Sequence, residues 1–225
     1  MGSVGAVISA YNEGQNVHRV LNTLHKIRWI DRIIVVDDGS TDDTYDVVCQ
    51  YGKVDPRICA IRLSENSGKS EAMWVGAGAL DCDVVLFLDA DLIGLKERHA
   101  KALCTPVLHG EADMVVGSFH PVKKISSQSI FINERFANPF SGQRCLRTED
   151  ARELLSSLRE SGFGVEAGLT LHARRRGWRV DYIPWNDMMH TRKEQKRGLI
   201  AGLKTRFSMY SQVAATIIEF PRYLL

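Results

Sequence analysis

Short apolar runs alternate with amphipathic stretches along the first 120 residues. The runs are rich in β-branched side chains and too short for helices, so they predict buried strands. We expect strands over 4–10, 32–36, 57–63, 83–88 and 113–119. The stretches between them carry apolar residues at helical spacing and predict helices over 15–27, 44–51, 68–80 and 95–108. This alternation predicts an α/β fold, with a mainly parallel sheet flanked by helices on both faces.

The pattern changes after residue 120. Residues 121–139 show no clean period, which predicts a loop with a short helix, of the kind that often covers a site. Beyond it the periodicity predicts helices over 147–159 and 165–176, a strand over 178–184, and a long amphipathic helix over 195–220. We therefore expect one domain with two halves, 1–120 and 121–225.

Polar clusters follow the first four predicted strands. They are Tyr11-Asn12-Glu13, Asp37-Asp38-Gly39-Ser40, residues 64–69, and Asp89-Ala90-Asp91. Ligands of a parallel sheet bind beyond the carboxyl ends of its strands. The four clusters are therefore expected to meet at one rim and to form the functional site.

Composition narrows the class of protein. The chain has 225 residues, of which 44% are apolar and 25% charged, and its net charge is +2. This ordinary globular balance gives no support to nucleic-acid binding. Five cysteines, an odd number without a close pair, fit a reducing compartment. We find no signal-peptide pattern and no run of 18 uncharged apolar residues, so the expected location is the cytoplasm.

Asp89 and Asp91 end a fully apolar strand. Two carboxylates there are costly unless they are solvated, hydrogen-bonded or paired with a cation. A hard divalent ion such as Mg²⁺ or Mn²⁺ takes oxygen ligands and shares its shell with substrate phosphates. The alternative is a pair of helix caps at a strand–helix junction. The three companion clusters favour the metal site.

The second and third clusters are candidates for nucleotide binding. Asp37 or Asp38 can accept hydrogen bonds from a nucleobase or ribose, or can stabilise its own turn. Ser40 followed by Asp43 also predicts a capped helix start. Gly68 and Lys69 open the third helix, where backbone N–H groups and a lysine favour phosphate. The alternative for Lys69 is an exposed side chain beside a helix start.

The second half holds three more candidates. His190 follows a strand and, as a neutral imidazole, can bind a metal, although a lone histidine is more often structural. Arg192 follows it and can face a diphosphate. Glu166, at a helix start, can bind sugar hydroxyls, act as a base, or simply favour the helix dipole. The residues alone leave these alternatives open.

The predicted C-terminal helix combines an apolar stripe with basic residues near its start. These are Lys193, Lys196, Arg197, Lys204 and Arg206. Such a helix either lies on an anionic membrane surface or packs on its own domain with a solvated basic face. Peripheral contact at the inner face of the membrane therefore stays open, and so does a homodimer.

The first 120 residues resemble glycosyltransferases of the Rossmann-like GT-A fold, within or near glycosyltransferase family 2. The matching segments are VISAYNE (7–13), VVDDGSTDDT (35–44), NSGKSEAMWVG (66–76) and LFLDADL (86–92). The resemblance implies contacts to base and ribose from Ala10, Tyr11, Glu13, Asp37 and Asp38. It implies that Asp91 binds the metal and that Asp89, with Ala90 beside it, lies near the ribose or sugar.

The second half is similar to glucosyl-3-phosphoglycerate synthases and related retaining enzymes. The matching segments are NPFSGQRCLR (138–147), GFGVEAGL (162–169) and the late His190. The resemblance implies that Ser141, Gly142 and Glu166 lie at the sugar end of the site and that His190 completes the metal shell. The Gly-Arg-x-Thr stretch that holds phosphoglycerate in those enzymes is absent, and residues 123–128 stand in its place.

These features predict a metal-dependent hexosyltransferase whose donor is a nucleoside diphosphate sugar, UDP-glucose first and GDP-mannose second. The acceptor is a phosphorylated small molecule or a polyprenyl phosphate. If the reaction inverts the anomeric carbon, Glu166 is the candidate base; if it retains, the leaving phosphate can assist the acceptor. One alternative is a nucleotidyltransferase, against which the acidic loop after the first strand counts. The other is a nucleotide-binding protein without catalysis.

Overall fold

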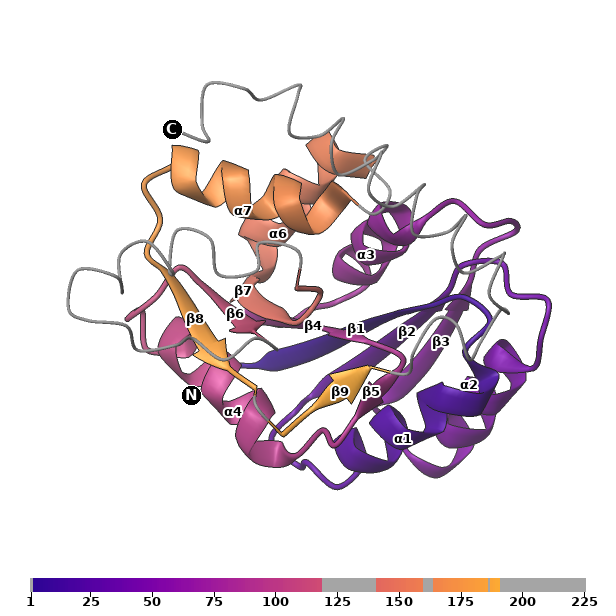
Figure 1. Ribbon diagram of the computed structural model, residues 1–225. Helices are drawn as coiled ribbons and strands as arrows, with labels where there is room; N and C mark the ends of the chain where they lie inside the picture. The colour runs from indigo at the N-terminus through magenta and orange to yellow at the C-terminus, as the bar shows by residue number, and fades with distance from the viewer. Residues whose placement is uncertain (1, 119–140, 160–163, 186, 191–225) are drawn as a thin grey trace.

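The computed structural model describes residues 2–118, 141–159, 164–185 and 187–190, with the backbone alone for 189 and 190. Seven strands form one sheet in the order β3-β2-β1-β4-β7-β6-β8 (Figure 1). They are β1 (Val4–Ala10), β2 (Arg32–Asp37), β3 (Ile58–Arg62), β4 (Val84–Asp89), β6 (Met114–Ser118), β7 (Arg144–Arg147) and β8 (Val180–Pro184). A second, two-stranded sheet joins β5 (Leu92–Ile93) to β9 (Met189–His190).

The first four strands of the large sheet run parallel, as the sequence predicts. β1 pairs with β2 and β4, and β2 pairs with β3. β7 is antiparallel to both of its neighbours, β4 and β6, whereas β6 and β8 are parallel. The hydrophobic pattern assigns no strand to β5, β7 or β9, because two to four residues are too few to display a period.

Helices cover both faces of the sheet. They are α1 (Gly14–Leu24), α2 (Thr44–Val54), α3 (Lys69–Gly78), α4 (Glu97–Leu108), α6 (Thr148–Leu158) and α7 (Val165–Arg175). Helices α1, α2 and α4 contribute to the apolar cluster on one face, and α3, α6 and α7 to the cluster on the other (Figure 1). Helix α2 begins at Thr44, as predicted, but the predicted cap is wrong: Asp43 makes no side-chain capping hydrogen bond.

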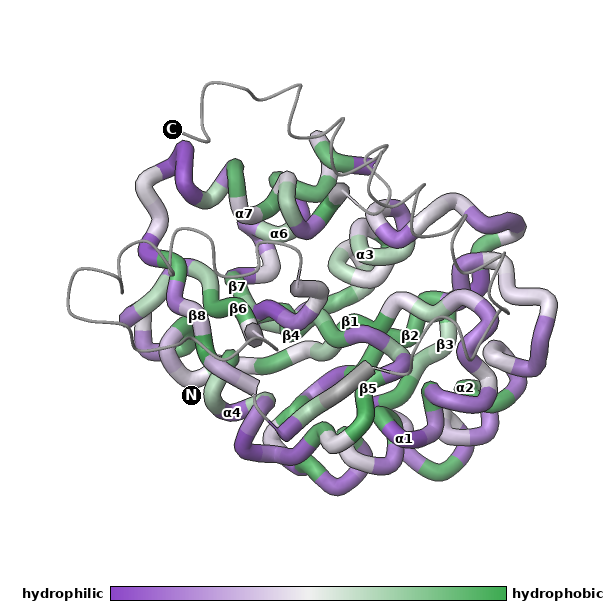
Figure 2. Tube along the Cα trace, viewed as in Figure 1, coloured by the Kyte–Doolittle hydropathy of each residue, from purple (hydrophilic) through white to green (hydrophobic). Residues whose placement is uncertain are grey.

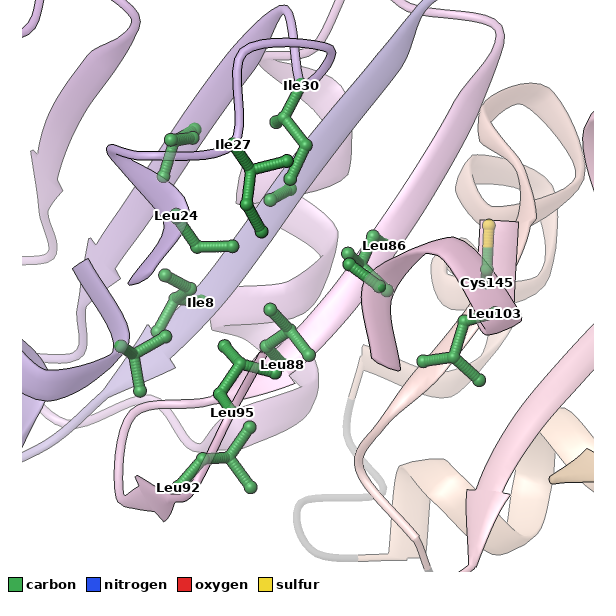
Figure 3. Close-up of a cluster of buried hydrophobic side chains, with 14 of the residues drawn as sticks. Ile8, Leu24, Ile27, Ile30, Leu86, Leu88, Leu92, Leu95, Leu103 and Cys145 are labelled. Atoms are coloured by element: carbon green, nitrogen blue, oxygen red, sulfur yellow. The ribbon is translucent and has the colours of Figure 1, made fainter. Parts of the chain in front are cut away.

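The core consists of one apolar cluster on each face of the sheet. Figure 3 shows the first cluster, in which Ile8 and Leu88 of the sheet lie near Leu24 of α1. The central strands are apolar along most of their length, as Figure 2 shows, because both of their faces are covered. Burying each such leucine or isoleucine contributes roughly 1.5–3 kcal/mol. A Cβ on Gly76 would lie 2.4 Å from Val7 Cγ1, so this glycine lets α3 approach β1 closely.

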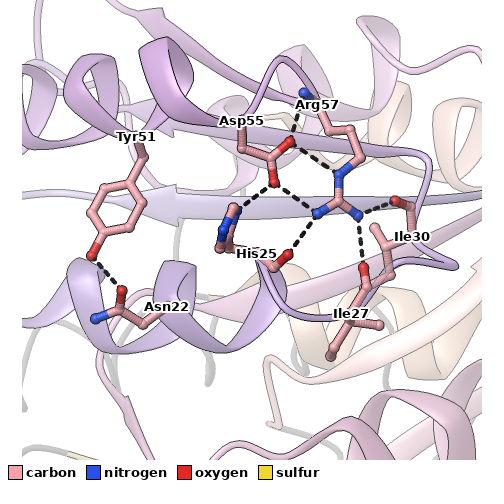
Figure 4. Close-up of polar contacts among 7 residues, drawn as sticks. All are labelled: Asn22, His25, Ile27, Ile30, Tyr51, Asp55 and Arg57. Carbon is pink, nitrogen blue, oxygen red and sulfur yellow. Dashed lines mark hydrogen bonds and ion pairs between the residues drawn. The ribbon is translucent and has the colours of Figure 1, made fainter.

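A hydrogen-bonded cluster of His25, Asp55 and Arg57 lies at the other end of the sheet, where β2 and β3 begin (Figure 4). Arg57 donates to the backbone carbonyls of Ile27 at 2.7 Å, Ile30 at 2.8 Å and His25 at 2.9 Å. Asp55 accepts from Arg57 Nη2 at 2.7 Å and lies 2.9 Å from His25 Nδ1. These hydrogen bonds, from Arg57 above all, hold the pKa of Asp55 well below its usual range.

Several predicted features lie outside the described residues. They are the loop at 121–139, the residues 191–193 with Arg192, and the amphipathic helix at 195–220. In the part of the chain that the structure describes, none of the helices has the length and apolar character needed to cross a bilayer.

Candidate functional site

The loops after β1 and β2 are tied together at the carboxyl-end rim of the sheet. The Asn12 N–H donates to Ser40 Oγ at 2.9 Å, and Asn12 Oδ1 accepts from the Thr41 N–H at 2.9 Å. Asn12 adopts a left-handed conformation with φ of 54°, which asparagine tolerates better than most residues. Ser40 therefore joins the two loops at the rim and does not cap the start of α2. The predicted meeting of these two clusters is confirmed.

Ala10, Tyr11 and Glu13 line the same rim. Ala10 is buried, and its carbonyl accepts from the Asp38 N–H at 2.8 Å. Tyr11 is half-buried where the chain leaves β1. The Glu13 N–H donates to Thr44 Oγ1 at 2.9 Å, and its carboxylate accepts from Asn16 Nδ2 at 2.8 Å. The local fold thus places the predicted nucleoside-contact residues together at the end of β1.

Asp37 and Asp38 have different structural tasks. Asp37 is buried, accepts from the Ser40 N–H at 3.0 Å and pairs with Arg62 Nε at 3.3 Å. Asp38 accepts from the backbone N–H groups of Ser67 at 2.7 Å and Gly68 at 2.9 Å. Burial raises the pKa of Asp38 despite these two hydrogen bonds. Asp37 therefore stabilises its own turn, whereas Asp38 holds the loop before α3 against the rim.

Lys69, Asp89 and Glu166 converge from three separate elements. Lys69 Nζ, at the start of α3, lies 2.5 Å from Asp89 Oδ1 at the end of β4. The same Nζ lies 2.6 Å from Glu166 Oε1 in the first turn of α7. Burial alone would lower the pKa of Lys69, but the two carboxylates outweigh it and raise the pKa above its usual value. Lys69 is therefore a fixed ammonium group and not an exposed side chain.

The segment before β7 closes this cluster from a further side. Gln143 Nε2 donates to the second carboxylate oxygen of Asp89 at 2.6 Å. Ser141 Oγ donates to the Gly117 carbonyl and lies 2.9 Å from Gln143 Oε1. A Cβ on Gly142 would lie 2.5 Å from Asp89 Oδ1 and 2.6 Å from Lys69 Nζ. A side chain at 142 would therefore force the Asp89 carboxylate and the Lys69 ammonium group, or the segment itself, to shift.

Arg144 lies beneath the same segment and is fully buried. Its guanidinium donates to the Ser141 carbonyl at 2.6 Å and to the Glu166 carbonyl at 3.0 Å. Thr170 Oγ1 also donates to the Glu166 carbonyl, at 3.0 Å. Burial lowers the pKa of Arg144, although the nearby carboxylates of Glu166 and Asp89 oppose the shift, and the guanidinium remains ionised.

The small sheet brings the backbone of His190 next to the Asp89-Ala90-Asp91 segment. Leu92, which follows Asp91, is paired with His190, and Ile93 with Met189. Residues paired directly across antiparallel strands have Cα atoms about 4.5–5.5 Å apart. Asp91 itself is half-buried at this edge. Asp91 and His190 were predicted as metal ligands and are 99 positions apart in the chain, yet this pairing brings their backbones close together in space.

The donor atoms at this edge fit a divalent ion. Asp89 Oδ1 accepts a hydrogen bond from the Lys69 ammonium group, so a positive charge is already bound at this edge. Among the described side chains, no three His, Cys, Asp or Glu residues gather closely enough to hold a metal by themselves. Asp91 would therefore share the ion with His190, whose side chain lies outside the described atoms, and with oxygens of a phosphate and water. Carboxylate oxygens favour Mg²⁺ or Mn²⁺.

The segment before β9 is anchored to α4. Asp187 accepts from Lys96 Nζ at 3.1 Å and from Arg98, and it lies 3.0 Å from His99 Nε2. Because His99 Nδ1 accepts from the Lys96 N–H at 3.1 Å, its proton lies on Nε2 and faces Asp187. Hydrogen bonds from Lys96 first, and from His99, lower the pKa of Asp187 to about 2. Asp187 thus stays ionised and fixes the position where β9 begins.

Gln143 and Arg144 are the site residues that the sequence analysis missed. Both stand inside the segment 138–147 that carries the family resemblance, directly after Ser141-Gly142. A polar pair just before the apolar Cys145-Leu146 is a signal for buried polar side chains, but only the antiparallel pairing of β7 turns it toward the site.

Comparison with known proteins extends these observations. The family model described as glycosyl transferase family 2 matches residues 6–155. A glucosyl-3-phosphoglycerate synthase of Mycobacterium tuberculosis (strain CDC 1551 / Oshkosh) is 30% identical over 196 residues, covering 75% of this chain and 60% of that protein. This chain therefore spans about 60% of the length of that relative. The uncharacterized glycosyltransferase YaiP of Escherichia coli (strain K12) is 37% identical over 117 residues, covering 52% of this chain and 29% of that protein.

Solved structures share the architecture. The Mycobacterium tuberculosis glucosyl-3-phosphoglycerate synthase in complex with Mn²⁺, uridine-diphosphate and glucosyl-3-phosphoglycerate superposes with a TM-score of 0.73 at 23% identity. The alignment covers 97% of this chain and 79% of that one. A complex of the same enzyme with Mg²⁺ and uridine-diphosphate gives the same score. At this identity the likeness establishes the fold, which is the predicted GT-A fold.

Proposed function

This chain belongs to glycosyltransferase family 2, and we propose that it transfers a hexose from a nucleoside diphosphate sugar, with UDP-glucose favoured over GDP-mannose, to a phosphorylated or lipid-linked acceptor. The observation that carries the proposal is the convergence of Lys69, Asp89 and Glu166 beside Asp91. The ammonium group balances only one of the two carboxylates, so the cluster keeps one negative charge and offers charged partners to a polar ligand.

The nucleoside end of the donor belongs at the rim formed by the first two loops. Tyr11 and Glu13 border this rim from one side, and Asp37 and Asp38 from the other. The hydrogen bonds that join Asn12 to Ser40 and Thr41 keep the two loops at a fixed separation. Such a preorganised edge binds a planar base and a ribose with little ordering cost.

The sugar end belongs at the cluster that Asp89, Glu166 and the Ser141-Gly142 segment form. Sugar hydroxyls are both donors and acceptors, and they can replace part of the contact between Lys69 and the two carboxylates. Glu166 is 5% exposed, so it meets a ligand from a nearly closed environment in which its hydrogen bonds are strong. Lys69 keeps the local charge close to balance while the hydroxyls bind.

Asp91 and His190 are the proposed metal ligands. When bound there, Mg²⁺ or Mn²⁺ would supply a Lewis acid that neutralises the diphosphate as it leaves. The glucosyl-3-phosphoglycerate synthase structures contain Mn²⁺ or Mg²⁺ together with uridine-diphosphate, which supports this assignment. The anchor of Asp187 to α4 keeps the backbone of His190 beside Leu92, next to Asp91.

The role of Glu166 bears on the stereochemical course. Its carboxylate is held 2.6 Å from the Lys69 ammonium group, which suits the binding of hydroxyl groups better than the removal of a proton from an acceptor. We therefore favour a retaining reaction, in which the leaving phosphate assists the acceptor.

Nucleotide binding with and without metal tests the donor. We would measure the thermal stability of the protein with UDP, GDP and their sugars, in the presence and absence of Mn²⁺. UDP and UDP-glucose should raise the melting temperature with Mn²⁺ and much less without it. Asp91→Ala should lose this metal dependence, whereas Asp81→Ala, at the opposite end of β4, should keep it. If no nucleotide stabilises the wild type with Mn²⁺ present, the proposal is wrong.

Product formation tests the acceptor separately. Labelled UDP-glucose would be incubated with phosphoglycerate in one reaction and with a polyprenyl phosphate in detergent in another. A labelled product with phosphoglycerate would extend the likeness to the glucosyl-3-phosphoglycerate synthases to the substrate. A product with polyprenyl phosphate alone would assign the acceptor to the membrane.

A further inference from the structure

We propose that Arg144 is a positioning residue that sets the sugar-binding end of the donor site while leaving the nucleotide end untouched. This inference rests on the proposed function, because it presumes that a sugar binds beside Asp89 and Glu166. The inference rests on two hydrogen bonds of Arg144, to the backbone carbonyls of Ser141 and Glu166, which belong to the sugar end of the proposed site.

The position of Arg144 in the sheet explains its reach. It is the first residue of β7, the strand that runs antiparallel between β4 and β6. Its backbone is in register with Phe87 of β4 and Val116 of β6. The side chain donates to the carbonyls of Ser141, three residues earlier, and Glu166, at the start of α7. One side chain thereby fixes the 141–143 segment, α7 and the centre of the sheet relative to one another.

The charges around Arg144 indicate a role beyond packing. Two cations, Lys69 and Arg144, lie near two carboxylates, Asp89 and Glu166, in a cluster that is buried at Arg144 and Glu166 and half-buried at Lys69 and Asp89. Removing a guanidinium from water is costly, and an apolar side chain of similar volume often gives equal or greater stability. Stability alone therefore does not account for an arginine at a fully buried position. An arginine at this position is instead explained by its placement of the Ser141 and Glu166 carbonyls.

The chain offers a matched control. Arg152 of α6 donates to the carbonyls of Ala77 at 3.0 Å and of Leu80, at the end of α3 that lies away from Lys69. Like Arg144, it joins separate elements through two backbone carbonyls. It differs in lying remote from Asp89 and Glu166. If the affinity or stability falls only because an arginine no longer donates to two carbonyls, the Arg152 variants should show the same loss as the Arg144 variants.

The test separates binding of the nucleotide from binding of the sugar. We would measure the Kd of UDP and of UDP-glucose, both with Mn²⁺, for the wild type and for Arg144→Lys, Arg144→Met, Arg152→Lys and Arg152→Met. Lysine keeps the charge but lacks the planar fork that reaches two carbonyls at once. In both Arg144 variants the Kd of UDP should stay within about twofold of the wild type, and the ratio of the UDP-glucose Kd to the UDP Kd should rise about tenfold.

Each outcome decides the proposal. The Arg152 variants should lower the melting temperature without changing the ratio of the two Kd values. An unchanged ratio in folded Arg144→Lys would overturn the positioning role, and so would an equal loss of affinity for both ligands. If neither Arg144 variant folds while both Arg152 variants do, Arg144 serves the fold and the proposal is likewise wrong. A wild type that binds neither UDP nor UDP-glucose would instead contradict the proposed function itself.

Discussion

Lys69 Nζ lies 2.5 Å from Asp89 Oδ1, and this contact joins the first residue of α3 to the last residue of β4. The same ammonium group lies 2.6 Å from Glu166 Oε1, so it also links α3 to α7. A strand–helix unit of the first half and a helix of the second half thus meet at one cation. The relationship makes Lys69 a part of the sugar end of the proposed site, whereas the sequence alone suggests a phosphate-binding lysine.

Replacing Lys69 by methionine should damage both stability and transfer. Asp89 and Glu166 would then share a nearly buried space without their cation, which should lower the free energy of unfolding by about 1–3 kcal/mol. Transfer from the donor should fall roughly 10²-fold, as for loss of a charged group in a preorganised site. Urea unfolding and donor turnover measure the two effects.

Lys101→Met is the control for Lys69→Met. Lys101 pairs with Glu97 at 2.8 Å on the exposed face of α4. Exposed pairs of this kind contribute about 0–1 kcal/mol, so little change is expected in either measurement. Equal effects of the two substitutions would contradict the role given to Lys69.

Adding one methyl group at position 142 should disturb the cluster. In Gly142→Ala the new Cβ would lie 2.5 Å from Asp89 Oδ1, so the segment or the carboxylate must move. We expect a stability loss of about 1–3 kcal/mol and a larger proportional loss of transfer. Gly78→Ala, in α3, meets no atom within 4 Å and should be neutral or slightly stabilising. Wild-type transfer activity in Gly142→Ala would contradict this prediction, because it would mean that the segment accommodates a methyl group beside Asp89.

The anchor of β9 should control metal affinity from a distance. Asp187→Asn removes the charge that Lys96, Arg98 and His99 surround, and so frees the chain three residues before His190. The affinity for Mn²⁺ in the presence of UDP should fall roughly tenfold, as for residues that hold a ligand in place. Titration with Mn²⁺, followed by the electron paramagnetic resonance of the free ion, measures this affinity.

Asp113→Asn is the control for Asp187→Asn. Asp113 accepts from the backbone and the side chain of Arg179, so it anchors the start of β8, whereas Asp187 anchors the segment before β9. This substitution should leave the affinity for Mn²⁺ unchanged. A wild-type affinity in Asp187→Asn would mean that the anchor has no influence on the metal.

The ion pair between Asp55 and Arg57 should make the stability of the protein depend on pH. The folded-state pKa of Asp55 is depressed, so its ionised form stabilises the fold above the ordinary carboxyl pKa of about 4. This contribution is lost progressively as the pH falls below about 4 toward the folded-state pKa. Asp55→Asn should therefore be about 1–3 kcal/mol less stable than the wild type at pH 7, and the difference should narrow in acid. Urea unfolding at several pH values between 7 and 2.5 tests it, and a difference that is constant with pH would contradict it.

Local pattern was sufficient for the parallel half of the fold. The runs ending at Ala10, Asp37 and Asp89 are apolar on both faces, and each is followed by polar residues and then by a helix. Parallel strands have their carboxyl ends at one rim of the sheet, so the convergence of the clusters follows from the strand–helix alternation. The prediction of glycosyltransferase family 2 is confirmed for the same reason: its motifs are local and lie in that half.

The hydrogen-bond and ion-pair partners of the site residues could not be predicted from the sequence. Asp38 and Glu166 were candidates for ligand contacts, yet their nearest partners are the backbone of Ser67 and Gly68 in one case and Lys69 in the other. The roles given to these residues in donor binding stay predictions. A carboxylate at a strand end has the same sequence signature whether it meets a ligand, an amide or an ammonium group.

The sequence by itself determined the alternating strands and helices of the parallel half, the family and the rim where the strand-end clusters meet, because hydrophobic periodicity and motif spacing are properties of neighbouring residues. Only the tertiary structure decided that β7 enters the sheet antiparallel, that β9 brings His190 beside Leu92, and that Lys69 joins Asp89 to Glu166. These contacts connect residues 20 to 98 positions apart. Their formation depends on the summed packing of the whole sheet, which no local window contains.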